Sequence, residues 1–258
     1  MLTWRLRRLG QRLALARLLD FAGTFRSPCR GVYATWEDAR SAIPNDRKMG
    51  YDHPEMTSLY MEYLDKVRPS DYPVLFWMKS AIGEVSQVFD LGGNLGLAFY
   101  SFKKYLDYPD DLQWTVCDLP EIIGLGSKLA KDRNAERLKF TQAYEDADGA
   151  GIFLTAGTLS FMETDLGTIL SQLQVKPRHL LINRAPLYDG ETFYTLRYLP
   201  PIMAVYRVFN KTQFIDSILV NGYRLVDEWK IPDGTLVIPF RPDKAVKAYT
   251  GLYFRLDS

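Results

Sequence analysis

The sequence predicts an α/β fold in which a doubly wound, mostly parallel sheet of seven strands ends on an antiparallel strand and follows a helical cap. Three observations predict it. From about residue 86, short apolar runs alternate with segments of helical spacing. Five such runs precede a hairpin-like end. With 258 residues, 47% of them hydrophobic, the chain can bury one large core. We therefore expect residues 86–258 to form the main domain.

Residues 1–28 are predicted to form a basic amphipathic helix. Leucines recur in it at helical spacing, and five arginines precede the first acid, Asp20: Arg5, Arg7, Arg8, Arg12 and Arg17. Such a helix packs on the protein or a partner, or its residues 1–25 lie on an anionic membrane. No apolar run reaches the ~20 residues that span a bilayer. We expect a cytoplasmic protein, with peripheral contact at the inner membrane surface as an open alternative.

Residues 29–85 are predicted to form a helical cap. Thr35, followed by Asp38, is compatible with a helix start, because a threonine oxygen can accept an orphan amide proton. Apolar positions between residues 59 and 67 fit another helix. The two prolines of "VRPSDYPVLFWMKS" then mark a turn before a helical segment through Phe76 and Trp77.

The main domain divides into strands and helices in turn. The predicted strands are "QVFDL", "LQWTVCDL", "RLKFTQA", "GIFLTAG" and "HLLINRA", then "GYRLVDEW" and a terminal pair, "TLVIPF" with "GLYFRL". The predicted helices cover residues 95–104, 122–132, 165–173 and 212–221. The stretch "LRYLPPIMAVYRVF", rich in aromatic and basic residues, could form a wall of a substrate site or a buried insertion.

Charge and residue counts argue against several classes of function. Lys and Arg total 32 against 31 for Asp and Glu, so no strong field implies a nucleic-acid partner. Cys29 and Cys117 lie far apart, and His53 and His179 lack metal-ligand spacing. We expect a reducing compartment, no disulfide framework and no metal, while the oligomeric state stays open.

The sharpest motif follows the first predicted strand, where "DLGGNLG" places glycines and an asparagine directly after Asp90. Doubly wound sheets bind ligands at the carboxyl ends of their strands, and the first strand-to-helix turn is the usual contact. Glycine permits left-handed backbone, and asparagine tolerates it better than most residues. The loop therefore suits close approach of its backbone to a ligand.

The acid beside this loop bears on the class of ligand. Dinucleotide sites use the spacing G-x-G-x-x-G, which fails here, and Asp90 would repel a phosphate. An acid suits a cationic ligand, and S-adenosylmethionine carries an ammonium and a sulfonium but no phosphate. After the second strand comes Asp118, roughly twenty residues on, where an acid commonly accepts ribose hydroxyls. Asp118 could instead cap the helix that Pro120 begins.

These motifs resemble the class I S-adenosylmethionine-dependent methyltransferases of Rossmann-like fold. "VFDLGGNLG", "VCDLP" and a third element ending near Tyr144 carry the resemblance. More narrowly, "GVYATWEDAR", "GYD", "DLGGNLG", "LLINRAPL" and "YRVF" together resemble a bacterial family of inferred methyltransferases associated with surface-polysaccharide gene clusters. The likeness runs from about residue 30 to the C-terminus.

The resemblance implies S-adenosylmethionine as cofactor and in-line displacement of its methyl group by a small-molecule or glycan acceptor. Around the methionine part it implies Asp90, Gly92, Gly93, Asn94 and Gly96. Around the ribose and adenine it implies Asp118, Leu119 and Tyr144, with Glu145 and Asp146 as alternatives to Tyr144. In the methyl-donor pocket it implies Thr155 and Ala156. Asn94 departs from the family's glycine, so cofactor affinity is the property that it affects.

Acceptor-side residues are less defined. His53, in the predicted cap, has a side chain whose ordinary pKa suits a general base, although a histidine in a turn is more often structural. Arg184 and Tyr188 follow the fifth strand and could bind an anionic or sugar substrate, or Arg184 could anchor its loop through a salt bridge. Two other functions stay open: a nucleotide- or sugar-nucleotide-binding enzyme, and a catalytically degenerate interaction module at the membrane surface.

Overall fold

The structure is a computed structural model that describes residues 28–45, 61–200 and 202–257. The predicted basic helix, apart from residue 28, and the candidate base His53 lie outside the described residues. Within the described ranges, no helix combines the length and the apolar character that crossing a membrane requires.

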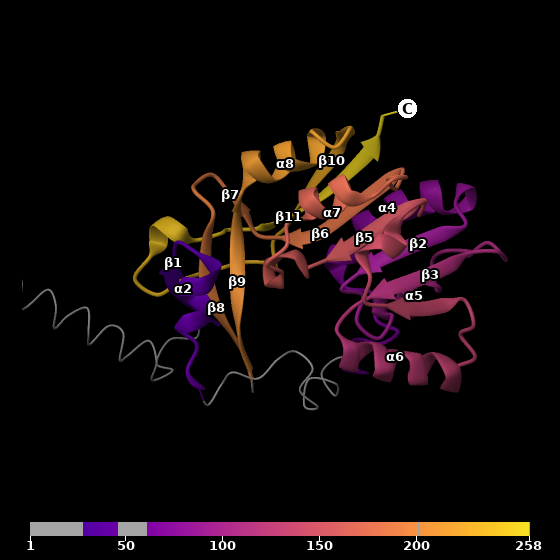
Figure 1. Cartoon of the computed structure of the whole chain (residues 1–258), viewed down its shortest axis with the longest axis horizontal. Helices are drawn as coiled ribbons and strands as arrows, with labels where there is room; N and C mark the ends of the chain where they lie inside the picture. The colour runs from indigo at the N-terminus through magenta and orange to yellow at the C-terminus, as the bar shows by residue number, and fades with distance from the viewer. Residues whose placement is uncertain (1–27, 46–60, 201, 258) are drawn as a thin grey trace, which may run out of the picture.

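A seven-stranded sheet forms the centre of the main domain (Figure 1). Its strands are β2 (Gln87–Leu91), β3 (Gln113–Cys117), β4 (Leu138–Thr141), β5 (Ile152–Ala156), β6 (His179–Ala185), β10 (Tyr223–Ile231) and β11 (Tyr249–Leu256). The spatial order is β10-β11-β6-β5-β2-β3-β4. Strands β2 to β6 are mutually parallel where they pair, and β11 is antiparallel to both of its neighbours. The predicted doubly wound, mostly parallel sheet of seven strands with an antiparallel last strand is confirmed.

The predicted terminal pair is wrong in one member. β11 pairs with β10 and β6, whereas the "TLVIPF" segment contributes a single isolated bridge, Leu236 with Val246. Pro239 interrupts that segment, and Pro242 starts a 3-10 turn just beyond it. Proline has no N–H to donate to a sheet ladder, so an apolar run with a proline near its end is a poor strand.

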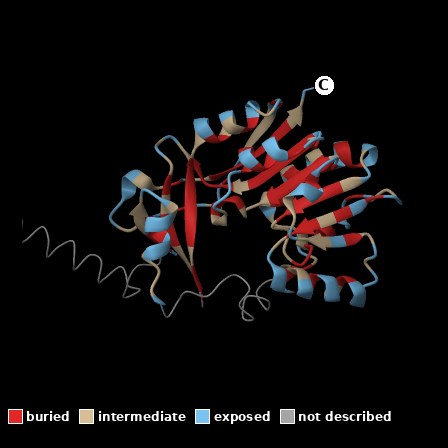
Figure 2. Cartoon of the chain, viewed as in Figure 1, coloured by how far each residue is buried: buried red, intermediate tan, exposed pale blue. Residues whose placement is uncertain are grey.

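Helices cover both faces of this sheet. They are α4 (Tyr72–Ala81), α5 (Leu97–Phe102), α6 (Pro120–Asp132), α7 (Leu166–Gln172) and α8 (Lys211–Leu219). Successive strand residues alternate between two cores: Val88 packs in the cluster that holds residues of α4 and α5, and Phe89 in the cluster that holds residues of α7 and α8. Figure 2 shows the central strands almost wholly buried between these layers.

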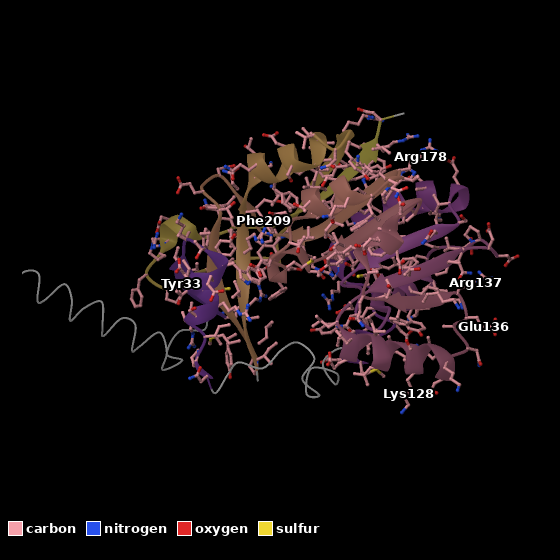
Figure 3. All side chains as sticks on the ribbon, in the orientation of Figure 1. Tyr33, Lys128, Glu136, Arg137, Arg178 and Phe209 are labelled. Atoms are coloured by element: carbon pink, nitrogen blue, oxygen red, sulfur yellow. The ribbon has the colours of Figure 1, made fainter. Side chains whose placement is uncertain are left out.

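A second sheet, which the sequence pattern did not predict, lies beside the first (Figure 1). Its order is β1-β8-β9-β7, with β1 at Cys29–Tyr33, β7 at Leu187–Tyr188, β8 at Phe193–Leu199 and β9 at Ile202–Asn210. Figure 3 labels Tyr33 and Phe209 on this sheet, far from Lys128 on α6 and Arg137 before β4. The described residues of the aromatic and basic stretch 196–209 thus lie mostly in β8 and β9, which pair antiparallel in a separate sheet.

The described part of residues 29–85 does not form one helical cap. β1 belongs to the second sheet, the short helix α2 (Trp36–Ser41) packs on β8 and β9, and α4 packs on the main sheet. The predicted start of α2 is confirmed, because Thr35 Oγ1 accepts a hydrogen bond from the Asp38 N–H at 3.1 Å. Short 3-10 turns lie at Pro69–Asp71, Ile82–Glu84, Tyr144–Ala147, Leu159–Phe161 and Pro242–Lys244.

Candidate functional site

A cavity of about 550 Å³ opens where the carboxyl ends of the parallel strands face the second sheet. The main domain contributes Leu91, Gly92, Asn94, Cys117, Asp118, Leu119, Pro120, Ile122, Gln142, Tyr144, Ala156, Gly157, Thr158, Phe161, Met162 and Arg184. The opposite wall consists of Arg197, Leu199 and Tyr206 from the second sheet with Tyr249 from the start of β11, and Arg68 completes the lining. The cavity lies at the point where strand order reverses, between β2 and β5.

The glycine loop after β2 turns through left-handed backbone at three positions. The φ angles are 70° at Gly92, 57° at Asn94 and 86° at Gly96. A Cβ at Gly92 would lie 1.9 Å from Thr158 Oγ1, and one at Gly93 would lie 2.4 Å from Asp90 Oδ2. Glycine is therefore needed at residues 92 and 93 for the loop to pack against Thr158 and over Asp90.

Asn94 is the position at which backbone strain can be tested directly. We expect Asn94→Val to lower the free energy of unfolding by about 1–2 kcal/mol, because a β-branched residue resists left-handed backbone. Asn94→Gly should stay within about 0.5 kcal/mol of wild type, because relief of strain offsets loss of the hydrogen bond that the Leu95 N–H donates to Asn94 Oδ1. Urea denaturation measures both, and an unchanged valine variant would contradict the strain argument.

Asp118 connects the loops after β2 and β3. Its Oδ2 accepts a hydrogen bond from the Asn94 N–H at 2.9 Å, and its Oδ1 accepts one from the Leu119 N–H at 2.8 Å. Burial raises the pKa of this carboxyl, and the two N–H donors act in the opposite direction. Neither of these two bonds reaches an N–H group within α6, which begins at Pro120. Each carboxylate oxygen can accept more than one bond, so Asp118 can still accept hydroxyl donors from the cavity.

Asp90 lies beneath the glycine loop and does not line the cavity. It is 2% exposed, and its Oδ2 accepts a hydrogen bond from Trp114 Nε1 at 3.1 Å. The pKa of Asp90 is raised to about 7, mainly by burial. The hydrogen bond from Trp114 acts in the opposite direction, the Asp118 charge adds to the rise, and the Arg184 charge opposes it. Asp90 therefore supports the loop from below, and it is neither a solvated strand end nor a wall of the cavity.

Comparisons with known proteins bear on this arrangement. The chain is similar in structure to the Burkholderia thailandensis 1,6-didemethyltoxoflavin-N1-methyltransferase with bound 1,6-didemethyltoxoflavin and S-adenosylhomocysteine, with TM-score 0.53, 20% identity and coverage of 79% of this chain and 83% of that one. A proposed S-adenosylmethionine-dependent methyltransferase from Listeria monocytogenes matches with TM-score 0.52 and 14% identity, over 73% of this chain and 99% of that one. The chain has a class I S-adenosylmethionine-dependent methyltransferase fold.

A third structure extends the likeness. The glycopeptide N-methyltransferase MtfA complexed with S-adenosylhomocysteine matches with TM-score 0.51 and 10% identity, over 80% of this chain and 99% of that one. No protein-family model and no curated protein matches the sequence. The shared feature is thus the methyltransferase fold.

Within the methyltransferase fold, the predicted site residues separate into two groups. Those that line the cavity are Gly92, Asn94, Asp118, Leu119, Tyr144, Ala156 and Arg184. Those that do not line it are Asp90, Gly93, Gly96, Thr155 and Tyr188. Thr155 is fully buried, and its Oγ1 has no hydrogen-bond partner in the described structure. Tyr188 lies on β7, where its hydroxyl donates to the Glu191 carbonyl and accepts from Lys244 Nζ.

Arg184 reaches the cavity but is already paired. Its Nη1 lies 2.8 Å from Asp71 Oδ1 and also donates to Ser70 Oγ, and its Nη2 donates to the Ala156 carbonyl at 3.0 Å. These contacts fit the anchoring alternative, in which the arginine holds its loop through a salt bridge. Arg184 also has a left-handed φ of 61°, near the irregularity in the pairing of β6 with β11.

Sequence reasoning offered the stretch "LRYLPPIMAVYRVF" as a substrate wall or a buried insertion without singling out any residue in it, and Arg197, Leu199 and Tyr206 line the cavity. Tyr249 and Arg68 gave no signal, since an isolated tyrosine or arginine is common on any surface. Only the pairing of distant segments brings these side chains together.

The Cys117 thiol and the Tyr249 phenol, which line the cavity, hold their protons at neutral pH. Burial raises the pKa of the Cys117 thiol to about 12, with the acids Asp118, Asp146 and Glu145 acting in the same direction. Burial also raises the pKa of Tyr249. Among the described residues that line the cavity, Asp118 is the one carboxylate and none is a histidine. The thiol and phenol are thus hydrogen-bond donors here, not bases.

Proposed function

We propose that the protein transfers a methyl group from S-adenosylmethionine to a small-molecule or glycan acceptor by in-line displacement. The observation that carries the proposal is a half-buried carboxylate, Asp118, held at the cavity wall by two backbone N–H groups. A carboxylate so placed is suited to two vicinal hydroxyls of a ribose. The methyltransferases of similar structure that carry S-adenosylhomocysteine support the same cofactor.

The hydrogen bonds of the N–H groups in the glycine loop support a ligand that places no phosphate at this loop. The N–H groups of residues 92–97 all have acceptors inside the protein: the carbonyls of Cys117, Asp90 and Gly93, the Asp118 carboxylate and the Asn94 amide oxygen. A pyrophosphate needs free N–H groups at such a turn. The loop therefore offers packing surface for the methionine part, and the neighbouring polar contact is an acid.

Other lining residues complete the proposed cofactor site. Leu119, Ile122 and Tyr144 are the apolar and aromatic surfaces beside Asp118 and suit an adenine ring. Arg68 is half-buried over the Tyr63 ring, at 4.3 Å to the ring centroid, and forms no ion pair with a described carboxylate. It also shares a second, small cavity with residues at the start of α5, next to the glycine loop. We assign it to the carboxylate of the methionine part.

When bound, S-adenosylmethionine supplies a methyl group on a positively charged sulfur. The protein's contribution is to align the acceptor and exclude water, which the apolar side chains of Phe161, Met162 and Leu199 favour. Asp118, the one carboxylate among the described lining residues, is assigned to the ribose, so His53, outside the described residues, stays our candidate for the general base. The resemblance to a surface-polysaccharide family is our reason to favour a glycan, acted on at the cytoplasmic side.

One observation favours a rival function. Three arginines line the cavity, namely Arg68, Arg184 and Arg197, against one carboxylate among the described lining residues. An excess of positive charge would also suit a nucleotide or a sugar nucleotide. The occupied N–H groups of the glycine loop weigh against this alternative, and a binding measurement separates the two.

Calorimetric titration of the full-length protein tests the proposal. We expect S-adenosylhomocysteine to bind in the micromolar range and at least ~10-fold more tightly than NAD⁺ or UDP-glucose, because the loop offers no free donors to phosphate. Tighter binding of either phosphate-bearing ligand would favour the nucleotide- or sugar-nucleotide-binding function over methyl transfer. Folded protein that binds none of the three would contradict both and favour an interaction module.

A further inference from the structure

The second sheet presents to the cavity an arginine that lacks a charge partner. Arg197, on β8, is half-buried, and its guanidinium lies over the Tyr206 ring at 4.8 Å to the ring centroid. Its Nη1 donates to the Tyr249 hydroxyl at 3.0 Å, whereas its Nε is enclosed without a hydrogen-bond partner. No described carboxylate forms an ion pair with it.

Two other enclosed arginines among the described residues are paired. Arg184, at the same cavity, contacts Asp71, and Arg207, behind it on β9, contacts Asp165 and the carbonyls of Met162 and Glu163. Taking a charge out of water without a partner is costly. Arg197, unlike these two arginines, has no ion-pair partner among the described residues, and it lines the cavity where a ligand would lie.

The Tyr249 hydroxyl adds a second donor at the same place. Its oxygen accepts from Arg197 Nη1 and from the Tyr206 hydroxyl at 3.2 Å, so its own proton remains for a further acceptor. Burial keeps this phenol protonated at neutral pH by raising its pKa. Gly234 lets the ring lie where it does, because a Cβ there would come within 2.7 Å of Tyr249 Cγ.

We propose that Arg197 and Tyr249 form a subsite that binds a carboxylate group of the methyl acceptor. The inference rests on the proposed function, because it assigns this wall to the acceptor, whereas Asp118 and Arg68 lie on the cofactor's side. A guanidinium presents two parallel N–H groups that match the two oxygens of a carboxylate. The neighbouring Phe161, Leu199 and Tyr206 suit a ring that bears this group.

A carboxylate fits the subsite better than a phosphate ester for reasons of charge. The guanidinium balances one negative charge, and the neutral hydroxyl adds a hydrogen bond but no charge. A phosphate monoester carries between one and two negative charges at neutral pH. Arg184, the other arginine of the cavity beyond the cofactor's side, is already balanced by Asp71. We therefore expect a monoanionic acceptor, such as an aromatic acid or a uronic acid.

Probe binding tests the subsite without knowledge of the acceptor. Dissociation constants of benzoate, benzamide and phenyl phosphate are measured by ligand-observed NMR on the full-length protein, with and without S-adenosylhomocysteine. We expect benzoate to bind at least ~10-fold more tightly than benzamide, since hydrogen bonds to charged groups contribute about 1.5–3 kcal/mol. The preference should vanish in Arg197→Gln and fall by a few fold in Tyr249→Phe, which removes one donor only.

Arg178→Gln is the matched control. Arg178 precedes β6 at the end opposite the cavity and is labelled in Figure 3, so its loss removes the same charge elsewhere. This variant should keep the benzoate preference. A preference that survives in Arg197→Gln, or that is absent from wild type, overturns the proposal, and tighter binding of phenyl phosphate overturns the carboxylate assignment. Calorimetry with S-adenosylhomocysteine on Arg197→Gln should give the wild-type affinity, so failure of the subsite is distinguishable from failure of the proposed function.

Discussion

Asp118→Ala is expected to weaken S-adenosylhomocysteine binding by at least ~100-fold while leaving the protein folded. A carboxylate that accepts two ribose hydroxyls makes two charge-assisted bonds of about 1.5 kcal/mol or more each, and each 1.4 kcal/mol is a factor of ten. The substitution also removes the acceptor of the Asn94 and Leu119 N–H groups, so the glycine loop loses its connection to the loop after β3. Calorimetry gives the affinity, and circular dichroism checks the fold.

Two variants sharpen this result. Asp118→Asn retains one oxygen acceptor but not the charge, so we expect an intermediate loss of affinity. Glu121→Ala removes an exposed acid from the first turn of α6 without touching the cavity, and it should bind like wild type. An Asp118→Ala protein with undiminished affinity would mean that the ribose lies elsewhere, and the proposed cofactor site would have to be abandoned.

Asp90→Asn is expected to gain stability relative to wild type as the pH rises. Burial raises the pKa of Asp90 to about 7 from an ordinary value of 3.8, so the folded protein holds this proton more tightly than the unfolded chain does. The associated stabilisation is present below pH ~4 and is lost as the pH rises through ~7. Three pKa units correspond to about 4 kcal/mol, an upper limit for the change between the two pH values.

Denaturant unfolding of both proteins at several pH values measures this difference. An asparagine oxygen can still accept the Trp114 Nε1–H bond, so Asp90→Asn should fold, and its advantage should appear only toward neutral and alkaline pH. Asp111→Asn, which changes an exposed acid just before β3, controls for the loss of one negative charge. Stability curves of Asp90→Asn and wild type that run parallel from acid to alkaline pH would refute the inference.

Much of the main sheet could be predicted because its information is local. The runs that became β2, β5 and β6 are rich in apolar residues and mostly buried, and each lies between turn residues, as buried parallel strands do. The second sheet left no such signature, because it joins residues 29–33 to residues 193–210 across most of the chain. Nothing within either segment indicates its partner, and β1 was therefore assigned to a helical cap.

The candidate site likewise has a part that local sequence predicts and a part that depends on long-range contacts. Gly92, Asn94 and Asp118 follow strands of the main sheet and were predicted to meet, and the structure brings them together. Asp90 was placed beside the ligand because it ends a strand, but the alternation of strand faces put its side chain under the loop. Arg197 and Tyr249, 52 residues apart, meet only through tertiary structure.

The position of β11 constrains how the protein can be made. This strand is inserted between β6 and β10, and β10 has no other partner among the described strands. During synthesis β10 therefore cannot pair in the sheet until residues 249–256 have left the ribosome. Tyr249 arrives with the same strand. The cofactor's half of the cavity can thus form on a nascent chain well before the half assigned to the acceptor exists.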